Sequence, residues 1–276
     1  MIRISTESGL RHSIEIGPHL LHTDVPESLG GGASVSVQTM TNVDPHDARA
    51  LSGQIARCAD LGADLVRLTV PDPEAAAVLG RVRKTSPVPL VADIHFDHRL
   101  ALAAIDAGVD ALRLNPGNIG GPANVRAVAR AAAARHVPIR IGVNGGSLPE
   151  DLRGSGDRAA AVVEAAEREL AVFEELGFTE LVVSMKASDV AETLAVNRRF
   201  AALHDYPLHI GVTEAGPLVT GVVKNTAALV PLLQEGIGDT VRVSLSDSPE
   251  NEVIAAREIL ACSGLGIILG SIIAGR

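Results

Sequence analysis

The chain has 276 residues, of which 46% are hydrophobic and only 2% aromatic, and its formal net charge is -9. This length can bury a sizeable core in one large domain or two small ones. The acidic balance and the shortage of aromatic side chains argue against a nucleic-acid-binding or anionic-membrane surface. Two cysteines, Cys58 and Cys262, provide neither a disulfide framework nor a zinc site.

Neither end of the chain carries a targeting or membrane signal. The opening stretch MIRISTESGLRHSIEIG lacks the apolar region of a signal peptide. The most apolar run near the C-terminus, LGIILGSIIAG, is too short to span a bilayer. We therefore expect a soluble cytoplasmic protein.

Eight short apolar runs, rich in β-branched residues, are predicted as strands. In chain order they are SVSVQTM (34–40), LVRLTV (65–70), LVADIHF (90–96), ALRLNPG (111–117), IRIGVN (139–144), LVVSMKA (181–187), LHIGVTE (208–214) and TVRVSLS (240–246). Each run is followed by a segment of helical character, at 44–63, 72–86, 97–109, 121–136, 156–178, 188–205, 216–238 and 248–264. Many of these segments open with Asp or Ser before Pro or an acid, and several end in Gly, as helices do.

This alternation predicts parallel βα units, and eight of them in about 250 residues predict a (β/α)8 TIM barrel. An open doubly wound sheet is the alternative. It is disfavoured because no GxGxxG turn follows the first strand. We divide the chain into an N-terminal segment (1–32), the barrel (33–262) and an apolar, Gly-rich tail (263–276).

The strands have one apolar and one polar face, because alternate side chains on a strand point in opposite directions. The polar faces carry Ser36 and Gln38, Arg67 and Thr69, Asp93 and His95, Arg113 and Asn115, Arg140 and Asn144, Ser184 and Lys186, His209 and Thr213, and Arg242 and Ser244. In a barrel this face points inward and toward the C-terminal mouth, where such enzymes place their active sites.

The polar faces hold far more positive than negative charge. Five cations, namely Arg67, Arg113, Arg140, Lys186 and Arg242, accompany one clear acid, Asp93, with Glu214 at a nearby strand end. Any single cation could be an ion-paired core residue, but we do not expect ion pairs within the protein to neutralise all five. We therefore expect Arg113 to pair with a ligand rather than with the protein. Phosphate or diphosphate suits the planar forks of several arginines.

Other motifs leave alternatives open. The loops NPGNIGGP and GVNGGSL could offer backbone N–H groups to phosphate, or could be ordinary turns. Asp93 and His95 could be an acid/base or metal pair, or His95 could be a hydrogen-bonded core residue. Glu214 suits a catalytic acid or a helix start, and Lys186 suits a Schiff base or a phosphate contact.

Several stretches resemble the barrel domain of the 4-hydroxy-3-methylbut-2-en-1-yl diphosphate synthase family, of the non-mevalonate isoprenoid pathway. They are VQTMTN, LVADIHFDHRLALAAIDAGVDALRLNPGNIG, IRIGVNGGSL, VVSMKASD, HIGVTEAGP and IGDTVRVSLS. The resemblance runs from residue 33 to 262 without large gaps, and the block 90–120 is its most specific part. It implies a TIM barrel of the pterin-binding, dihydropteroate-synthase-like type.

The resemblance also implies a reaction. The family reductively opens 2-C-methyl-D-erythritol 2,4-cyclodiphosphate to 4-hydroxy-3-methylbut-2-enyl diphosphate, an oxidoreductase step that uses ferredoxin or flavodoxin as electron donor. By resemblance, the diphosphate-binding residues are Arg67, Arg113, Arg140 and Lys186, helped by Asn144, Ser147 and Ser184. Asp93 and His95 would contact the substrate nearby, and Glu214 would be the proton donor or the carboxylate that faces the hydroxyl group. Arg242 and Ser244 would close the polar ring, to which Asn115 also belongs.

The family's [4Fe-4S] cluster has no counterpart here. In the family, three cysteines and a glutamate in a C-terminal domain hold the cluster, and that domain of one subunit caps the barrel of the other in a homodimer. This sequence has no C-P-x-C motif, and Cys262 alone cannot hold a cluster. Two alternatives therefore stand beside the enzyme: an inactive diphosphate-binding barrel, and another phosphate-binding barrel enzyme of dihydropteroate-synthase type.

Overall fold

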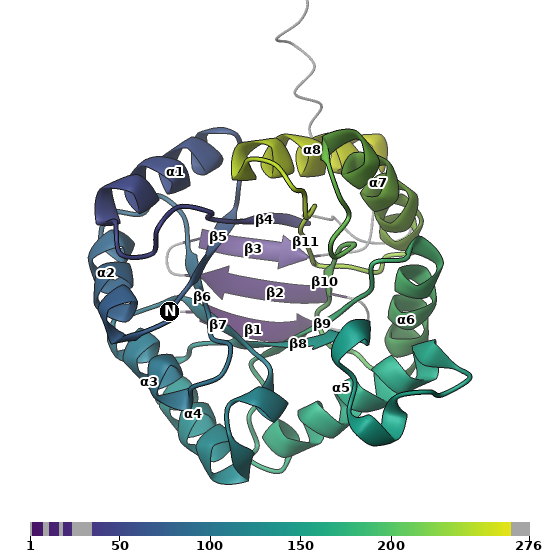
Figure 1. The fold of residues 1–276 in the computed structure, drawn as a ribbon, viewed down its shortest axis with the longest axis horizontal. Helices are drawn as coiled ribbons and strands as arrows, with labels where there is room; N and C mark the ends of the chain where they lie inside the picture. Colours follow the sequence, from purple (N-terminus) through teal and green to yellow (C-terminus); the bar gives the residue numbers. More distant parts are fainter. Residues whose placement is uncertain (1, 8–10, 17–18, 24–34, 266–276) are drawn as a thin grey trace, which may run out of the picture.

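Eight parallel strands form a barrel in the computed structural model, which describes residues 2–7, 11–16, 19–23 and 35–265 (Figure 1). The strands are β4 (Ser36–Met40), β5 (Leu65–Thr69), β6 (Leu90–Asp93), β7 (Ala111–Leu114), β8 (Ile139–Asn144), β9 (Leu181–Lys186), β10 (His209–Ile210) and β11 (Thr240–Val241). Sequential strands pair in parallel and β11 pairs with β4. A bridge between Val183 and Leu208 joins β9 to β10 and closes the ring. The predicted (β/α)8 barrel is confirmed.

Eight helices surround the strands as an outer ring (Figure 1). They are α1 (Ala48–Asp60), α2 (Pro73–Arg83), α3 (His98–Asp106), α4 (Gly121–Arg135), α5 (Arg158–Glu174), α6 (Val190–Leu203), α7 (Leu218–Gln234) and α8 (Pro249–Cys262). Short 3₁₀ turns, η2 (Pro116–Asn118), η3 (Gly145–Ser147) and η4 (Glu150–Leu152), follow β7 and β8. Side-chain caps begin six of these helices, since the N-cap side chains of Asp47, Asp72, Asp97, Asp157, Asp189 and Ser248 accept first-turn N–H groups. α4 and α7 begin without a side-chain cap.

The main core lies between the strands and the helices. The outward-facing strand residues are apolar and buried, as Leu112, Ile139 and Val183 illustrate. Phe173 of α5 and Phe200 of α6 are fully buried in the same layer. Packing on the helices therefore uses one face of each strand and leaves the other face to the barrel interior.

Three aspartates tie neighbouring strands together at the N-terminal end of the barrel. Each stands directly before a strand, and its carboxylate accepts a backbone N–H group at the start of the preceding strand: Asp64 from Val37 (2.7 Å), Asp110 from Leu90 (2.8 Å) and Asp239 from Leu208 (2.6 Å). Arginines from the surrounding helices bind two of these carboxylates, Arg257 to Asp64 and Arg83 to Asp110. The carboxylates thus satisfy N–H groups at the strand starts.

Several strands end before the expected element bounds. β6 ends at Asp93 and β7 at Leu114, so His95 and Asn115 lie beyond these strands. β10 and β11 have two residues each, so Thr213 and Ser244 lie beyond the regular strands. Backbone hydrogen bonds still join neighbouring segments there. Thr213 N donates to Ala187 O (3.0 Å), and Arg242 N donates to Ile210 O (3.1 Å). A Cβ on Gly211 would overlap the Arg242 carbonyl, so the close approach of these two backbone segments requires glycine at this position.

The N-terminal segment forms a structure for which we had no expectation. β1 (Ile2–Glu7), β2 (Arg11–Ile16) and β3 (His19–Thr23) pair as a three-stranded antiparallel sheet. Most of the predicted tail, residues 266–276, lies outside the described residues. Within the described part of the chain, no helix is long and apolar enough to cross a bilayer.

The aspartate ties generate a stability prediction. Asp110→Ala leaves the buried N–H group of Leu90 and the Arg83 guanidinium without this carboxylate, so we expect the free energy of unfolding to fall by about 1–3 kcal/mol. Urea unfolding followed by far-ultraviolet circular dichroism measures this, since the chain has no Trp. Asp106→Ala, which removes an exposed ion pair with Arg135, is the control and should change stability by less than about 0.5 kcal/mol. Equal effects of the two substitutions would contradict the assignment.

Candidate active site

The polar strand faces point into the barrel, as the alternation of side chains predicts. Arg140 of β8 donates across the interior to Oε1 of Gln38 on β4, the strand on the far side of the ring. The strand register places Asp93 beside Arg113, Arg113 beside Arg140, and Asn144 beside Lys186. The cations predicted from sequence are therefore neighbours around one interior space.

Asp93 of β6 is the first acid of this ring and holds three positively charged or protonatable partners. Its Oδ1 lies 3.2 Å from Nη1 of Arg113, and its Oδ2 lies 3.5 Å from Nε of Arg67 and 3.1 Å from Nε2 of His95. Burial by itself raises the pKa of Asp93. The charge of Arg67, the hydrogen bond from His95 and the charge of Arg113 outweigh burial, and the pKa lies well below its usual range.

This geometry corrects the expectation that Arg113 pairs only with a ligand. Arg113 pairs with Asp93, because the two residues are register partners on adjacent strands. The pairing is shared, however, since one carboxylate serves Arg113, Arg67 and His95 together.

A second buried acid, Glu252 on the first turn of α8, escaped the sequence analysis. Its carboxylate accepts from Nη2 (2.9 Å) and Nε (3.1 Å) of Arg242, from the hydroxyl of Thr39 (2.8 Å) and from the N–H group of Leu245 (3.0 Å). The expectation that Asp93 is the one clear acid among the cations is therefore wrong. The only local signal was a pair of acids in the first turn of the helix, Glu250 and Glu252, and the sequence does not tell which of them turns inward.

Arg140 is the least compensated cation. It is only 6% exposed, it contacts Gln38 through one nitrogen, and its Nη2 is buried without a hydrogen-bond partner among the residues that the structure describes. Burial lowers the pKa of Arg140 well below its ordinary value, and repulsion from Arg67 and Arg113 lowers it further. A bound anion would raise this pKa again, because a nearby negative charge favours the charged form of the guanidinium.

Lys186 is held by a neutral histidine. Its ammonium group lies 3.0 Å from Nε2 of His209, whose Nδ1 lies 2.7 Å from the hydroxyl oxygen of Thr240. Burial lowers the pKa of His209 well below its ordinary value, and Arg140 and Lys186 add to this. The contacts are satisfied when Nε2 accepts from Lys186 and Nδ1–H donates to Thr240. Burial also lowers the pKa of Lys186, and the nearby arginines Arg242 and Arg140 add to this.

The remaining predicted residues lie around the barrel mouth. Glu214 is exposed and has a left-handed backbone (φ 49°), an unusual conformation for a residue with a side chain. With Asn144, Lys186 and Thr213 it lines a cavity of about 340 Å³. Ser184 is buried on β9, Ser244 is half-buried beyond β11, and Asn115 accepts the Gly117 N–H (2.9 Å) in its own turn. Ser147 lies in η3, and its side chain is outside the described structure.

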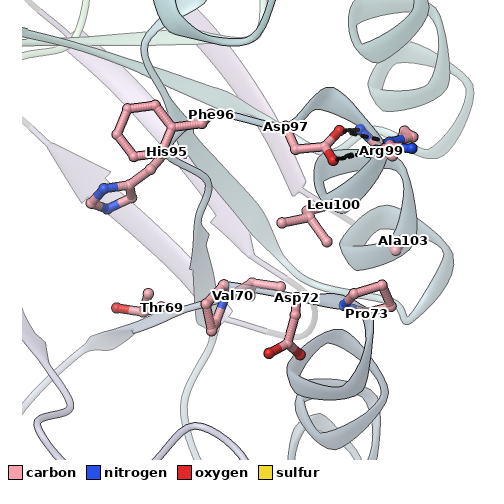
Figure 2. Close-up of a pocket in the computed structure, with 11 residues that line it drawn as sticks. Thr69, Val70, Asp72, Pro73, His95, Phe96, Asp97, Arg99, Leu100 and Ala103 are labelled. Atoms are coloured by element: carbon pink, nitrogen blue, oxygen red, sulfur yellow. Dashed lines mark hydrogen bonds and ion pairs between the residues drawn. The ribbon is translucent and has the colours of Figure 1, made fainter.

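A cavity of about 550 Å³ lies beside the ring rather than inside it, between the loops that follow β5 and β6. Figure 2 shows His95 and Phe96 on one side of this cavity, Thr69, Val70 and Pro73 on another, and Arg99 turned away to pair with Asp97. Among the polar residues of the strand faces, only Thr69 and His95 line this cavity. The five interior cations do not line it, so it is not the anion site.

Neither cysteine fits an iron–sulfur site. Cys58 is buried in α1, and burial raises the pKa of its thiol to about 12. Cys262 is exposed at the end of α8. Among the described residues, no group of three or more His, Cys, Asp or Glu side chains could hold a metal ion. We therefore derive no chemical step through a cluster bound to these residues.

Gly142 makes room for the Arg113 guanidinium and generates a testable prediction. A Cβ at position 142 would lie 2.8 Å from Nε and 3.0 Å from Nη2 of Arg113. Gly142→Ala displaces the guanidinium, so we expect the affinity for inorganic pyrophosphate to fall about tenfold in a calorimetric titration. Gly156→Ala, whose Cβ meets nothing within 4 Å, should bind like the unmodified chain. Unchanged binding by Gly142→Ala would refute the packing argument.

Comparison with known proteins bears directly on this site. Residues 24–257 match the family described as the GcpE TIM-barrel domain. The chain is 52% identical over 239 residues to the 4-hydroxy-3-methylbut-2-en-1-yl diphosphate synthase (flavodoxin) of Thermodesulfovibrio yellowstonii, covering 86% of this chain and 68% of that protein. It is 50% identical over 239 residues to the enzyme of the same name from Acinetobacter baylyi, covering 86% and 64%. The chain thus spans about two thirds of the length of these relatives.

Solved structures of similar fold include dihydropteroate synthases. That of Yersinia pestis has a TM-score of 0.62 and 15% identity, covering 91% of this chain and 98% of that chain. That of Xanthomonas albilineans has a TM-score of 0.62 and 17% identity, covering 91% and 96%. At this identity the likeness concerns the fold alone. The sequence matches decide the family: the chain belongs to the 4-hydroxy-3-methylbut-2-en-1-yl diphosphate synthases and comprises their TIM-barrel domain.

Proposed function

We propose that the barrel mouth binds 2-C-methyl-D-erythritol 2,4-cyclodiphosphate, and that the chain is the substrate-binding domain of an enzyme that converts it to 4-hydroxy-3-methylbut-2-enyl diphosphate. The observation that carries the proposal is the charge imbalance inside the barrel. Five cations face two buried acids, Asp93 and Glu252, which leaves three positive charges without a counter-charge in this ring. Uncompensated buried charge is costly unless a ligand pairs with it.

The positions of the cations suit a diphosphate. Arg113, Arg140 and Lys186 stand on the consecutive strands β7, β8 and β9, so two linked phosphate groups can span them. Arg140 offers its free Nη2, and arginine forks bind phosphate oxygens in pairs. We assign Arg67 and Arg242 to the opposite side of the same ring, with Ser184 below and Asn115, Asn144, Ser147 and Ser244 at the mouth.

The acid and base groups are assigned from the same arrangement. Glu214 stands at the mouth on the cavity that also reaches Lys186, so a substrate held by the cations would present its carbon skeleton to this carboxyl. We propose Glu214 as the proton donor to the departing hydroxyl. Asp93 and His95 orient Arg67 and Arg113, and His95 lies at the edge of the site for contact with the substrate.

The complete reaction needs components that these residues do not supply. The two cysteines of the sequence cannot provide the three thiolates of the family's [4Fe-4S] cluster, so residues outside this sequence would hold it. The names of the relatives specify flavodoxin, and we propose flavodoxin as the electron donor, with ferredoxin as the alternative. A homodimer and a cytoplasmic location are part of the same proposal.

A second candidate function is a barrel that binds the cyclic diphosphate without turning it over. The observation that favours it is the pair of isolated cysteines, Cys58 and Cys262. If a complex of this chain with a protein that carries the C-P-x-C motif contains iron, the chain is part of the enzyme rather than a binding-only barrel. The likeness to dihydropteroate synthases, at 15% and 17% identity, is one of fold alone.

Calorimetric titration of the purified chain with the cyclodiphosphate, at low and moderate salt, tests the binding proposal. We expect salt-sensitive binding, because charged contacts are screened by salt. Binding should be lost in Arg113→Ala and kept in Arg99→Ala, which removes an arginine that is exposed and paired with Asp97. No binding by the folded chain would overturn the proposal of a preformed site.

Arg140→Met should separate stability from binding. Without ligand, the substitution removes a buried charge that has no acidic partner, so we expect the free energy of unfolding to rise by about 1–2 kcal/mol. The same change should abolish cyclodiphosphate binding. Urea unfolding and calorimetry on the same preparation measure both quantities. A variant that is less stable than the unmodified chain would show that Arg140 is a structural cation.

A further inference from the structure

A carboxyl group outside the ring of interior cations lies against the turn that follows one of the arginine-bearing strands. Glu169 stands on α5, and its Oε1 faces the turn after β7, where it receives the backbone N–H group of Gly117. Asn115 of the same turn accepts that N–H group as well, at 2.9 Å. A Cβ on Gly117 would lie 3.2 Å from both acceptor oxygens, so the carboxyl group and the turn are packed against each other.

The other oxygen of this carboxyl group, Oε2 of Glu169, is buried and makes no hydrogen bond within the described part of the chain. Burial raises the pKa of Glu169 to about 7, while the Gly117 N–H group and the charge of Arg113 act in the opposite direction. Arg113 is the charged side chain that acts on it. The neighbouring buried faces of α4 and α5 are apolar, with Val125, Val128, Ala165, Ala166 and Phe173.

We propose that Glu169 is a positioning residue of the anion site, which holds the turn behind Arg113 and takes up a proton when an anion binds. The inference rests on the proposed function, because it needs an anion beside Arg113. It adds a coupling between proton binding and substrate binding.

The coupling follows from the charges. In the ligand-free chain, Arg113 stabilises the ionised form of Glu169. An anion on Arg113 cancels that effect and adds negative charge nearby, so the carboxyl group binds protons more tightly. By linkage, protonated Glu169 strengthens anion binding to the same extent. A group with a pKa of about 7 is about half protonated at pH 7, so binding can add at most about half a proton there.

The cyclodiphosphate is a clean probe for this effect. Each of its phosphorus atoms carries one ester bond, one anhydride bond and one strongly acidic oxygen, so its charge stays constant around neutral pH. Any proton taken up on binding is therefore bound by the protein and not by the ligand. Lys186 and His209, whose pKa values are lowered by burial, can also take up protons when an anion binds, so the contribution of Glu169 is obtained by difference.

The experiment is calorimetric titration of the full chain at pH 7 in two buffers of different ionisation enthalpy, which counts protons taken up per ligand bound. We expect net uptake by the unmodified chain and a loss of up to about half a proton in Glu169→Gln. Glutamine keeps the size of the side chain and an oxygen acceptor for Gly117. Glu164→Gln is the matched control: it makes the same chemical change on the exposed face of α5, and uptake should match the unmodified chain.

The outcomes separate the two proposals. Binding without proton uptake by the unmodified chain would overturn the role of Glu169 directly, even if Glu169→Gln did not fold. Equal uptake in Glu169→Gln and Glu164→Gln would also overturn it, while the binding proposal would stand. A complete absence of binding would overturn the proposed function and this inference together.

Discussion

Positive charge without full compensation inside the barrel is the constraint on which the rest of the site depends. Five cationic side chains share an interior with two buried acids, and Arg140 keeps a nitrogen without any partner. Such an arrangement lowers the stability of a ligand-free protein, because buried charges lose their hydration. It becomes favourable when a multiply charged anion enters. The interior therefore has the electrostatics of a binding site rather than of a core.

Contacts far from the barrel mouth offset the loss of stability that the buried charges cause. At the N-terminal end of the barrel, aspartates such as Asp64 and Asp110 bind both a strand start and an arginine from a surrounding helix. Outside the strands, an apolar layer that includes Phe173 and Phe200 is fully buried. The stabilising contacts of the barrel thus lie at its base and outer layer, away from the C-terminal mouth where we propose that the anion binds.

Much of the architecture was predictable because local signals were strong. Eight apolar runs, helix-start residues such as Asp72 and Ser248, and the alternation of side chains predicted the barrel and the inward direction of its cations. The resemblance of the block around DIHF to one family agrees with 52% identity over 239 residues to a member of that family. The ends of β10 and β11 were less predictable, because the close approach at Gly211 is a contact between strands that a single run does not record.

The sequence by itself determined the fold class and which cations line the interior, because spacing and alternation are properties of neighbouring residues. The family came from the resemblance of its motifs to those of a known family. The tertiary structure alone decided how these charges are compensated. Asp93 serves Arg113 and Arg67 from adjacent strands, Glu252 reaches Arg242 and Thr39 from the last helix, and Glu169 stands behind the turn after β7. The physical reason is that a carboxylate on a helix is locally indistinguishable from a solvated one. Only packing decides which carboxylate turns inward and loses its water.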